Sequence, residues 1–600
     1  MLLTIKQPGS DDKVIDVAPG ISIIEALTQA SLMLDSPCGG KGRCGKCLIK
    51  ASGKLSEPQA SELAHLADHP GYRLACLAKI EGNCAVELTG QSVFSSLKGL
   101  GWTAPYSLDP ALKLFPIGPR DRLDQRSLLN TLELNSCTVD SLETLSAIEA
   151  KGGGGWLLTC HDRLLKVWPQ EKDDKEKAHK DQEHKEQEHK DQAHKRQAPM
   201  ENLAAAFDLG TTGLALAVID METKKTIAFE TSLNPQTAIG GDVISRITYA
   251  AESQENIKTL QNLALKGLRE LLESALGERS RFVSAALISG NTTMLHLLAG
   301  LNPKSLALAP YRPIFTKSLD ISHLGEKIGL PKWACFSTTP SISAYVGGDI
   351  TSGLVAVKLA ERKGTVIFID IGTNGEIVLS RNGKLVATSC AAGPALEGMN
   401  ITCGLRAITG AVDSFKIGPN LEPNFTTIGQ APAIGICGSG LIDICAELIK
   451  SGVINKTGRM SAPKSHPQAL TDNRYHLTDK VFLDQKDVRQ VQLAKGAIAA
   501  AMKMLLERFD LTLSDLDEIV IAGAFGFHLR PESLKGIALI PKGYEGPVSF
   551  VGNSSLAGVV RLLLDRSATK EIETISNQIE VIELGFDPKF QDAFLASLGF

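Results

Sequence analysis

The stretch Phe207-Asp-Leu-Gly-Thr-Thr-Gly213 lies between two apolar runs, residues 203–206 and 214–219. Two apolar strands joined by a tight Gly/Thr turn predict a hairpin whose turn can hold a phosphate against backbone N–H groups. Asp208, the one acid of the turn, would then face a metal ion. The same pattern also occurs in turns that bind nothing, so a single copy does not decide the function.

A second copy of this pattern begins at Val366 and reads Val-Ile-Phe-Ile-Asp-Ile-Gly-Thr-Asn-Gly-Glu, with Asp370 in the position of Asp208. Each predicted hairpin is followed by a long amphipathic helix and by an apolar strand that ends in glycine. The expected helices and strands are 256–276 and 285–289 with Gly290, then 488–509 and 518–522 with Gly523. Residues 200–600 are therefore predicted to be an internal duplication.

Two half-domains that each aim an acid and a Gly-Thr turn at a shared cleft resemble the acetate and sugar kinase, heat-shock chaperone and actin superfamily of ATPases. The resemblance implies a duplicated α/β, actin-like (ribonuclease H-like) ATPase that binds ATP and Mg²⁺. It implies that Asp208 and Asp370 position Mg²⁺ and the attacking water, with the turns on the phosphates. The turn residues are Gly210, Thr211, Thr212 and Gly213, then Gly372, Thr373, Asn374 and Gly375.

The resemblance to this superfamily assigns further segments of residues 200–600 to the nucleotide site. The run Ile519-Val-Ile-Ala-Gly-Ala-Phe-Gly526 matches the adenosine motif of the superfamily, through Gly523, Ala524 and Gly526. The run Gly435-Ile-Cys-Gly-Ser-Gly-Leu-Ile-Asp443 predicts a Gly-rich turn that opens a helix, whose N–H groups suit an anion. We prefer a nucleotide contact through Gly438, Ser439 and Gly440, and a tight helix contact is the alternative.

Two other features of the same region have competing interpretations. Asp242 and Arg246 could order a loop over the cleft, or they could form an ordinary i,i+4 surface pair. His296 is expected to be a packed histidine.

The first 90 residues predict a β-grasp ferredoxin, because a hairpin (2–6 and 13–17) and a helix (22–32) precede a Cys-rich loop. The spacing Cys38-x5-Cys44-x2-Cys47, followed by Cys76, is close to the plant-type [2Fe–2S] pattern with one extra residue in the first gap. A four-Cys zinc site is the alternative, but it usually shows two paired Cys-x2-Cys units. Cys84 lies outside the pattern.

Between the ferredoxin and the ATPase region we expect a linker at 91–106, a small α+β middle domain at 107–169 and a second linker at 170–199. The middle domain should contain helices 124–132 and 139–150 and strands 156–160 and 163–167. We assign no chemistry to it and expect a spacer or a subunit contact in a homodimer. The second linker repeats a charged five-residue unit whose histidines do not share a helical face, which favours a solvated chain over a metal site.

The composition excludes several classes of partner. The 600 residues carry 63 basic and 67 acidic side chains, a net charge of −4, so neither nucleic acid nor a membrane surface is an expected partner. No signal peptide and no apolar run of about 18 residues is found, and a cytoplasmic protein is expected.

A ferredoxin joined to an acetate-kinase-like ATPase resembles the reductive activators of corrinoid proteins. The resemblance implies ATP-dependent reduction of Co(II) to Co(I), with a corrinoid protein or methyltransferase component as partner and an external low-potential electron donor. The five-residue repeat matches no family motif. Two alternatives remain open: a redox-sensing, nucleotide-dependent scaffold, and a small-molecule kinase in which Glu376 is the general base.

Overall fold

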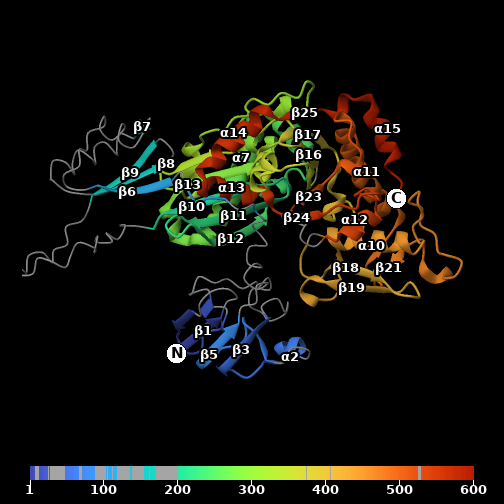
Figure 1. The fold of residues 1–600 in the computed structure, drawn as a ribbon, viewed down its shortest axis with the longest axis horizontal. Helices are drawn as coiled ribbons and strands as arrows, with labels where there is room; N and C mark the ends of the chain where they lie inside the picture. The colour runs from blue at the N-terminus through green and yellow to red at the C-terminus, as the bar shows by residue number, and fades with distance from the viewer. Residues whose placement is uncertain are drawn as a thin grey trace, which may run out of the picture. The chain divides into compact units, whose positions relative to one another are not determined.

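The computed structural model describes residues 1–6, 13–23, 26–27, 48–66, 71–87, 103, 106–110, 112–117, 136–137, 155–160, 163–169, 201–372, 374–405, 407–523 and 529–600. They form two compact units, drawn with the rest of the chain in Figure 1. One unit comprises Met1–Ala104, Ala356–Ala557 and Gln578–Phe600, and the other comprises Pro105–Val355 and Gly558–Asn577. We call 201–355 with 558–577 the first lobe, and 356–557 with 578–600 the second lobe.

The N-terminal region is a five-stranded sheet in the order β2-β1-β5-β3-β4. Its strands are β1 (Leu2–Lys6), β2 (Lys13–Asp16), β3 (Leu48–Leu55), β4 (Tyr72–Leu74) and β5 (Ile80–Glu87). β1 pairs antiparallel with β2 and parallel with β5, which is the β-grasp arrangement that the sequence predicts. Alternate side chains such as Leu3 and Ile5 are buried, as a sheet with one covered face requires. Of the predicted helix 22–32, residues 23, 26 and 27 are helical and the others lie outside the described residues, apart from Ser22.

A short helix, α2 (Ala60–Leu66), is anchored to this sheet by a buried ion pair. The carboxylate of Glu62 is fully buried and accepts from Arg73 Nε at 2.8 Å and from the Leu74 N–H at 2.7 Å.

The middle region contains a four-stranded sheet in the order β6-β8-β9-β7. Its strands are β6 (Leu112–Ile117), β7 (Ser136–Cys137), β8 (Gly155–Cys160) and β9 (Arg163–Pro169). The predicted strands 156–160 and 163–167 are confirmed as β8 and β9. The predicted helices 124–132 and 139–150 lie outside the described residues.

The first lobe is built on a sheet in the order β12-β11-β10-β13-β14. Its strands are β10 (Leu203–Leu209), β11 (Gly213–Asp220), β12 (Lys225–Leu233), β13 (Val283–Gly290) and β14 (Cys335–Thr338). Its helices include α6 (Val243–Glu252), α7 (Gln254–Leu276), α8 (Thr292–Leu298) and α9 (Gly348–Ala356). The helix predicted at 256–276 is confirmed as α7, which begins two residues earlier because Ser253 caps it by accepting from the Asn256 N–H.

Residues 558–577 return to the first lobe from far along the chain, which the sequence analysis did not foresee. They belong to α13 (Ser554–Leu564) and α14 (Arg566–Gln578). A Cβ at Gly558 would lie 1.9 Å from the Ser352 carbonyl oxygen, so only glycine lets α13 pack this closely on α9. One helical turn later, the buried guanidinium of Arg561 donates to the Val355 carbonyl.

The second lobe repeats the layout of the first around a six-stranded sheet in the order β24-β23-β15-β16-β17-β25. Its strands are β15 (Thr365–Ile371), β16 (Gly375–Arg381), β17 (Lys384–Cys390), β23 (Glu518–Ala522), β24 (Val548–Gly552) and β25 (Glu580–Ile582). The long helix predicted at 488–509 is confirmed as α11 (Gln485–Arg508), which packs on β16 and β17. It begins earlier than predicted because Asp484 and Asp487 form a capping box.

Smaller elements complete the second lobe. They are β18 (Ala411–Ile417), β19 (Pro423–Thr427), β20 (Gly435–Ile436), α10 (Gly438–Lys450), β21 (Tyr475–His476), β22 (Phe482–Leu483), α12 (Pro531–Gly536) and α15 (Pro588–Ala596). β18 pairs with β19 and β20 in a separate three-stranded sheet, and α10 packs against both β18 and α12.

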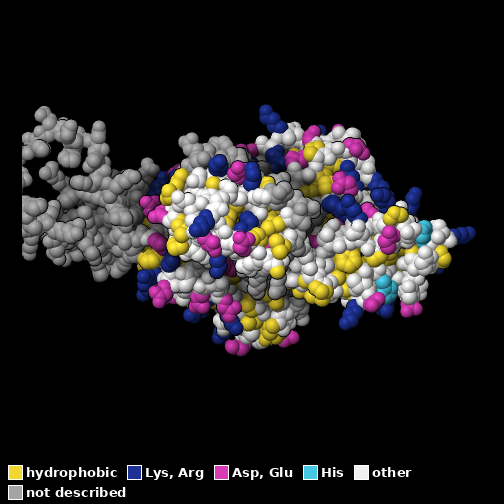
Figure 2. Space-filling view, turned by 90° about the horizontal axis from the view of Figure 1, so that it is seen from below, with side chains coloured by type: hydrophobic (Ala, Val, Ile, Leu, Met, Phe, Trp, Pro, Cys, Tyr) yellow, Lys and Arg dark blue, Asp and Glu magenta, His cyan; other side chains and the backbone are white. Residues whose placement is uncertain are grey.

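Basic and acidic side chains are interspersed on the face of the molecule drawn in Figure 2. Within the described part of the chain, no helix combines the length and apolar character needed to cross a membrane.

Candidate functional site

The predicted cluster site is represented in the described residues by Cys76, since Cys38, Cys44 and Cys47 lie outside them. Cys76 follows β4 in a turn where the Ala78 N–H donates to the Leu74 carbonyl, and its side chain is half-buried. Cys84 in β5 is instead 6 % exposed within the apolar core of the sheet, and burial raises the pKa of its thiol. A ligand must be a thiolate, so the environment of Cys76 suits a cluster better than that of Cys84.

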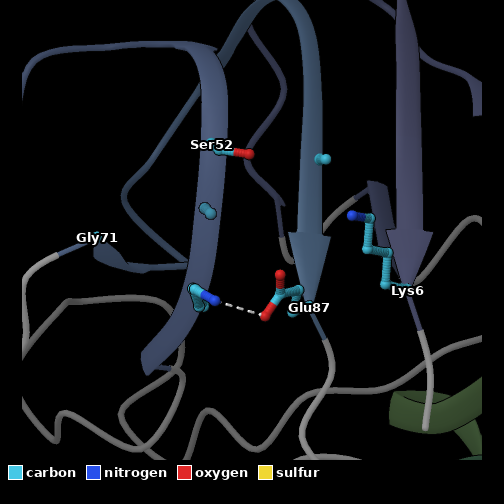
Figure 3. Close-up of a pocket in the computed structure, with 7 residues that line it drawn as sticks. Lys6, Ser52, Gly71 and Glu87 are labelled. Atoms are coloured by element: carbon cyan, nitrogen blue, oxygen red, sulfur yellow. Dashed lines mark hydrogen bonds and ion pairs between the residues drawn. The ribbon is translucent and has the colours of Figure 1, made fainter.

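The same sheet carries a pocket of about 150 Å³, shown in Figure 3. Its lining residues are Lys6, Lys50, Ala51, Ser52, Gly71, Ala85 and Glu87. Lys50 Nζ and Glu87 Oε2 are 2.8 Å apart in an exposed cross-strand pair, which already satisfies both charges. Among the described residues, the predicted ligand Cys76 does not line it, and we assign no cofactor to this pocket.

The two predicted turns occupy equivalent positions in their sheets. Asp208 on β10 lies opposite Ala215 of β11 and Ser289 of β13. Asp370 on β15 lies opposite Glu376 of β16 and Ala522 of β23 in the same pattern of antiparallel and parallel pairing. Both carboxylates therefore stand at the end of a central strand, immediately before the turn.

The glycines at the ends of β13 and β23, the strands that pair parallel with β10 and β15, are also equivalent. A Cβ at Gly290 would lie 2.6 Å from the Leu209 carbonyl oxygen, and one at Gly523 would lie 2.5 Å from that of Ile371. Gly523 also has a positive φ of 116°, which other residues rarely adopt. Ala524 and Gly526, the other predicted adenosine contacts, lie outside the described residues.

Three side chains or backbone groups hold the first turn from one side. Asn234 Nδ2 donates to the Gly210 carbonyl at 2.8 Å, and the Asn234 N–H donates to the Thr212 carbonyl at 2.9 Å. The Thr211 carbonyl accepts from Arg246 Nη2. Three successive carbonyls of the turn are therefore engaged by Asn234 and Arg246. Asn291 Nδ2 additionally donates to Thr211 Oγ1 at 2.9 Å.

The structure contradicts the surface-pair interpretation of Asp242 and Arg246, because the Arg246 side chain is fully buried. Its Nε donates to the Gly240 carbonyl at 2.9 Å, and the ordering of a loop over a cleft stays a prediction. Asp242 is instead the N-cap of α6, where it accepts from the Ser245 N–H at 2.8 Å. The spacing of four residues reflects a cap followed by a buried helix position.

His296 is packed, as expected. Its Nδ1 lies 2.7 Å from the Thr292 carbonyl, its Nε2 accepts from the Ile314 N–H at 3.0 Å, and its ring stacks on Phe315. Burial lowers the pKa of His296, so the neutral ring serves as a fixed structural link.

Asp349 is a candidate site residue that the sequence analysis missed. It lies in the first turn of α9, and burial together with the charge of Asp208 raises its pKa to about 7. Gly347, just before α9, packs closely on the start of α8, because a Cβ there would lie 2.5 Å from Asn291 Cα. The sequence feature that could have pointed to Asp349 is the run Gly347-Gly-Asp349 before a helix, which resembles Gly240-Gly-Asp242 earlier in the chain.

The second turn is closed by the Gly372 N–H, which donates to the Asn374 carbonyl at 3.0 Å, while Thr373 lies outside the described residues. Glu376 is half-buried and accepts from Ser389 Oγ at 3.3 Å on the neighbouring strand. Asp370, Glu376 and Ser389 thus form a row across three strands.

The Gly-rich turn before α10 is tightly packed. A Cβ at Gly438 would lie 2.0 Å from the Leu396 carbonyl oxygen, and one at Gly440 would lie 2.1 Å from that of Val412. Ser439 Oγ donates to the Asp413 carbonyl at 2.9 Å. These contacts account for both glycines through the tight helix contact that was the alternative, and the nucleotide role of Gly438, Ser439 and Gly440 stays a prediction.

One buried carboxylate links α10 to the chain just beyond the predicted adenosine segment. Asp443 accepts from Arg530 Nε at 3.0 Å and from Ser533 Oγ at 2.6 Å. Arg530 also donates to the Phe415 carbonyl at 2.9 Å, so the segment after 524–528 is anchored to both α10 and β18.

Three family models match successive parts of this chain. They are described as a 2Fe-2S iron-sulfur cluster binding domain (residues 7–81), the RACo middle region (203–362) and the C-terminal domain of RACo, the ASKHA domain (364–600). The fold and these matches define an iron–sulfur protein with an actin-like ATPase domain, which binds a [2Fe–2S] cluster and ATP.

Full-length similarities specify the family further. The chain is 29% identical over 98% of its length, and 98% of the relative's, to the corrinoid activation enzyme RamQ of Eubacterium limosum. It is 25% identical to the [Co(II) methylated amine-specific corrinoid protein] reductase of Methanosarcina barkeri, over 66% of this chain and 76% of that one. A solved reductive activator for a corrinoid, iron-sulfur protein superposes with a TM-score of 0.71 at 27% identity, covering 100% of this chain and 98% of the other. The chain belongs to the family of reductive activators of corrinoid proteins.

Proposed function

We propose that this protein uses ATP to drive the transfer of one electron from its [2Fe–2S] cluster to a corrinoid protein, reducing cobalt from Co(II) to Co(I). The observation that carries the proposal is the full-length similarity to corrinoid activators, in a chain that joins a cysteine-bearing β-grasp sheet to a duplicated Asp-x-Gly-Thr hairpin. A kinase does not require the first module, and a simple ferredoxin does not require the second.

The coupling to ATP has an energetic reason. A one-electron transfer costs about 1.4 kcal/mol for each ~59 mV of unfavourable potential. A plant-type cluster lies near −400 mV, so a more negative acceptor needs an additional free-energy source. A protein whose nucleotide-bound state binds the partner differently can supply it through that difference in affinity.

The residues proposed for the nucleotide are those of the two turns. Asp208 and Asp370 would orient Mg²⁺ and water, and the turns at residues 210–213 and 372–375 would hold phosphate oxygens, with the Gly372 N–H engaged inside its own turn. The engagement of the carbonyls of residues 210–212 supports this role for the first turn. Gly523, Ala524 and Gly526 are proposed for adenosine, and Cys38, Cys44, Cys47 and Cys76 for the cluster.

The other assignments also remain proposals. They are an external low-potential electron donor, a homodimer, a cytoplasmic location in which thiolates stay reduced, and the domain limits 1–90, 107–169 and 200–600. The middle domain would serve as the spacer or subunit contact.

The test uses the full chain, a Co(II) corrinoid protein, a low-potential reductant and MgATP, with the corrinoid absorption spectrum as the readout. We expect Co(I) to accumulate with ATP and not without it. Cys44→Ser should abolish both the cluster signal and the reduction, and the matched Cys84→Ser should retain both. Equal reduction without nucleotide across several corrinoid partners would support the redox-sensing scaffold instead.

A further inference from the structure

Arg246 is a buried cation whose hydrogen-bond partners are all neutral. Its side chain has no solvent exposure. The acceptors are the Gly240 carbonyl at 2.9 Å, Gln236 Oε1 at 3.0 Å, Met294 Sδ at 3.1 Å and the Thr211 carbonyl. Burial lowers the pKa of Arg246 to about 10, so the guanidinium remains protonated at neutral pH. The Asp242 carboxylate opposes this shift only through its charge, since it caps α6.

A second buried arginine in the same lobe has carboxylate partners of the kind that Arg246 lacks among the described residues. Arg561 is 1% exposed, and its guanidinium pairs with Asp565 at 3.3 Å and with Glu571 at 2.7 Å. Among the described residues no carboxylate forms such a pair with Arg246. Burying an unpaired charge is unfavourable, so a protein that retains one needs a compensating interaction.

The position of Arg246 indicates where that compensation comes from. Its Nη2 donates to the Thr211 carbonyl, so the guanidinium is in direct contact with the first turn. A negative charge bound at the turn would therefore lie close to the guanidinium in a region of low polarity, where the attraction between them is strong. Adenosine has no such charge, and a triphosphate has several.

We propose that Arg246 is a positioning residue that selects polyphosphate, because its unpaired charge lies directly behind the first turn. The proposal rests on the nucleotide-binding part of the proposed function. It adds that discrimination between ATP and its less charged analogues comes from this buried cation and not only from the N–H groups of the turn.

The most specific variant keeps Arg246 and balances its positive charge with a neighbouring carboxylate. Gln236→Glu puts a carboxylate at an acceptor 3.0 Å from Arg246 Nη1, and Gln236→Met removes the same amide without adding charge. We expect Gln236→Glu to raise the Kd for ATP about tenfold and to reduce the differences in Kd among ATP, ADP and AMP. The Kd for adenosine should change less than about twofold. Gln236→Met should keep the wild-type order of the three Kd values. Calorimetry on the full-length protein, with inorganic triphosphate as an adenosine-free probe, measures these values.

A second pair of variants removes the charge itself. Arg246→Met should lose ATP affinity selectively, whereas Arg269→Met, at an exposed arginine paired with Glu273 on α7, should not. Arg246→Lys keeps a charge without the planar fork and should recover part of the selectivity. The cluster spectrum and far-UV circular dichroism report whether each variant is folded.

The outcomes separate this inference from the proposed function. If the wild-type protein binds ATP but Gln236→Glu keeps the wild-type ratio of ATP to adenosine affinity, Arg246 is purely structural. Equal losses of ATP and adenosine affinity in Gln236→Glu would overturn the inference in the same way. If the wild-type protein binds no nucleotide, the proposed function itself fails.

Discussion

The two Asp-x-Gly-Thr turns have the same strand register but are supported differently. The first turn is held from behind by Asn234 and the buried cation Arg246, and its acid lies near Asp349 on α9. The second turn has Glu376 directly opposite its acid, on the adjacent strand, with Ser389 beyond it. The duplicated backbone thus places two acids equivalently, while the charged groups around them differ.

The largest expected effect comes from removing either acid. Asp208→Ala and Asp370→Ala should each lower ATP hydrolysis by about 10²-fold or more, because each removes a group that organises metal and water. Steady-state hydrolysis measures this loss, with Glu270→Ala at an exposed position of α7 as a control. Near-normal hydrolysis in Asp370→Ala would show that only the first turn handles nucleotide.

Gly290 and Gly523 test whether the backbones of the two repeats are equivalent. Gly290→Ala and Gly523→Ala both force a Cβ against a carbonyl oxygen, and an alanine at position 523 would also be strained by the φ of 116° found there. We expect Gly290→Ala to cost roughly 1–3 kcal/mol of unfolding free energy. Gly523→Ala should cost about 1–2 kcal/mol more. Urea unfolding measures both, and a larger loss at Gly290 would contradict the assigned geometry.

The second carboxylates should differ in their effect on Mg²⁺. Asp349 accepts from the Ile350 N–H at 2.9 Å but lies near the like charge of Asp208, so a divalent cation would relieve more unfavourable charge there than at Glu376. Asp349→Asn should therefore raise the Mg²⁺ concentration for half-maximal hydrolysis about tenfold. Glu376→Gln should raise this Mg²⁺ concentration less. Mg²⁺ titrations of both variants measure the difference, and a larger increase in Glu376→Gln would contradict the proposed effect of Asp349.

The smallest expected effect is a pH dependence carried by His296 in the first lobe. Its folded pKa lies below the unfolded value near 6.5, so the unfolded chain binds the proton first as pH falls. The stability contribution is present above pH 6.5 and is lost below it, by at most about 1.4 kcal/mol per pH unit. His296→Gln should reduce the pH dependence of the unfolding free energy between pH 7 and 5. An unchanged slope of unfolding free energy against pH would show that His296 titrates normally.

The periodic parts of the fold were predictable from the sequence. Apolar alternation and helical spacing located β10, β15, α7, α11 and β23, since those signals are local. The buried position of Arg246 was not predictable, because an Asp and an Arg four residues apart look like a surface pair until the helix face is known. Asp349 and the return of 558–577 depend on contacts between distant segments, which no local pattern reports.

The return of α13 to the first lobe has a consequence for synthesis of the protein. Arg561 lies 206 residues after Val355, whose carbonyl it binds. At roughly 5–20 residues per second, a ribosome needs about 10–40 s to make that intervening chain. During this interval the face of α9 that includes Ser352 and Val355 has no covering helix, so the nascent first lobe is an expected client for chaperones.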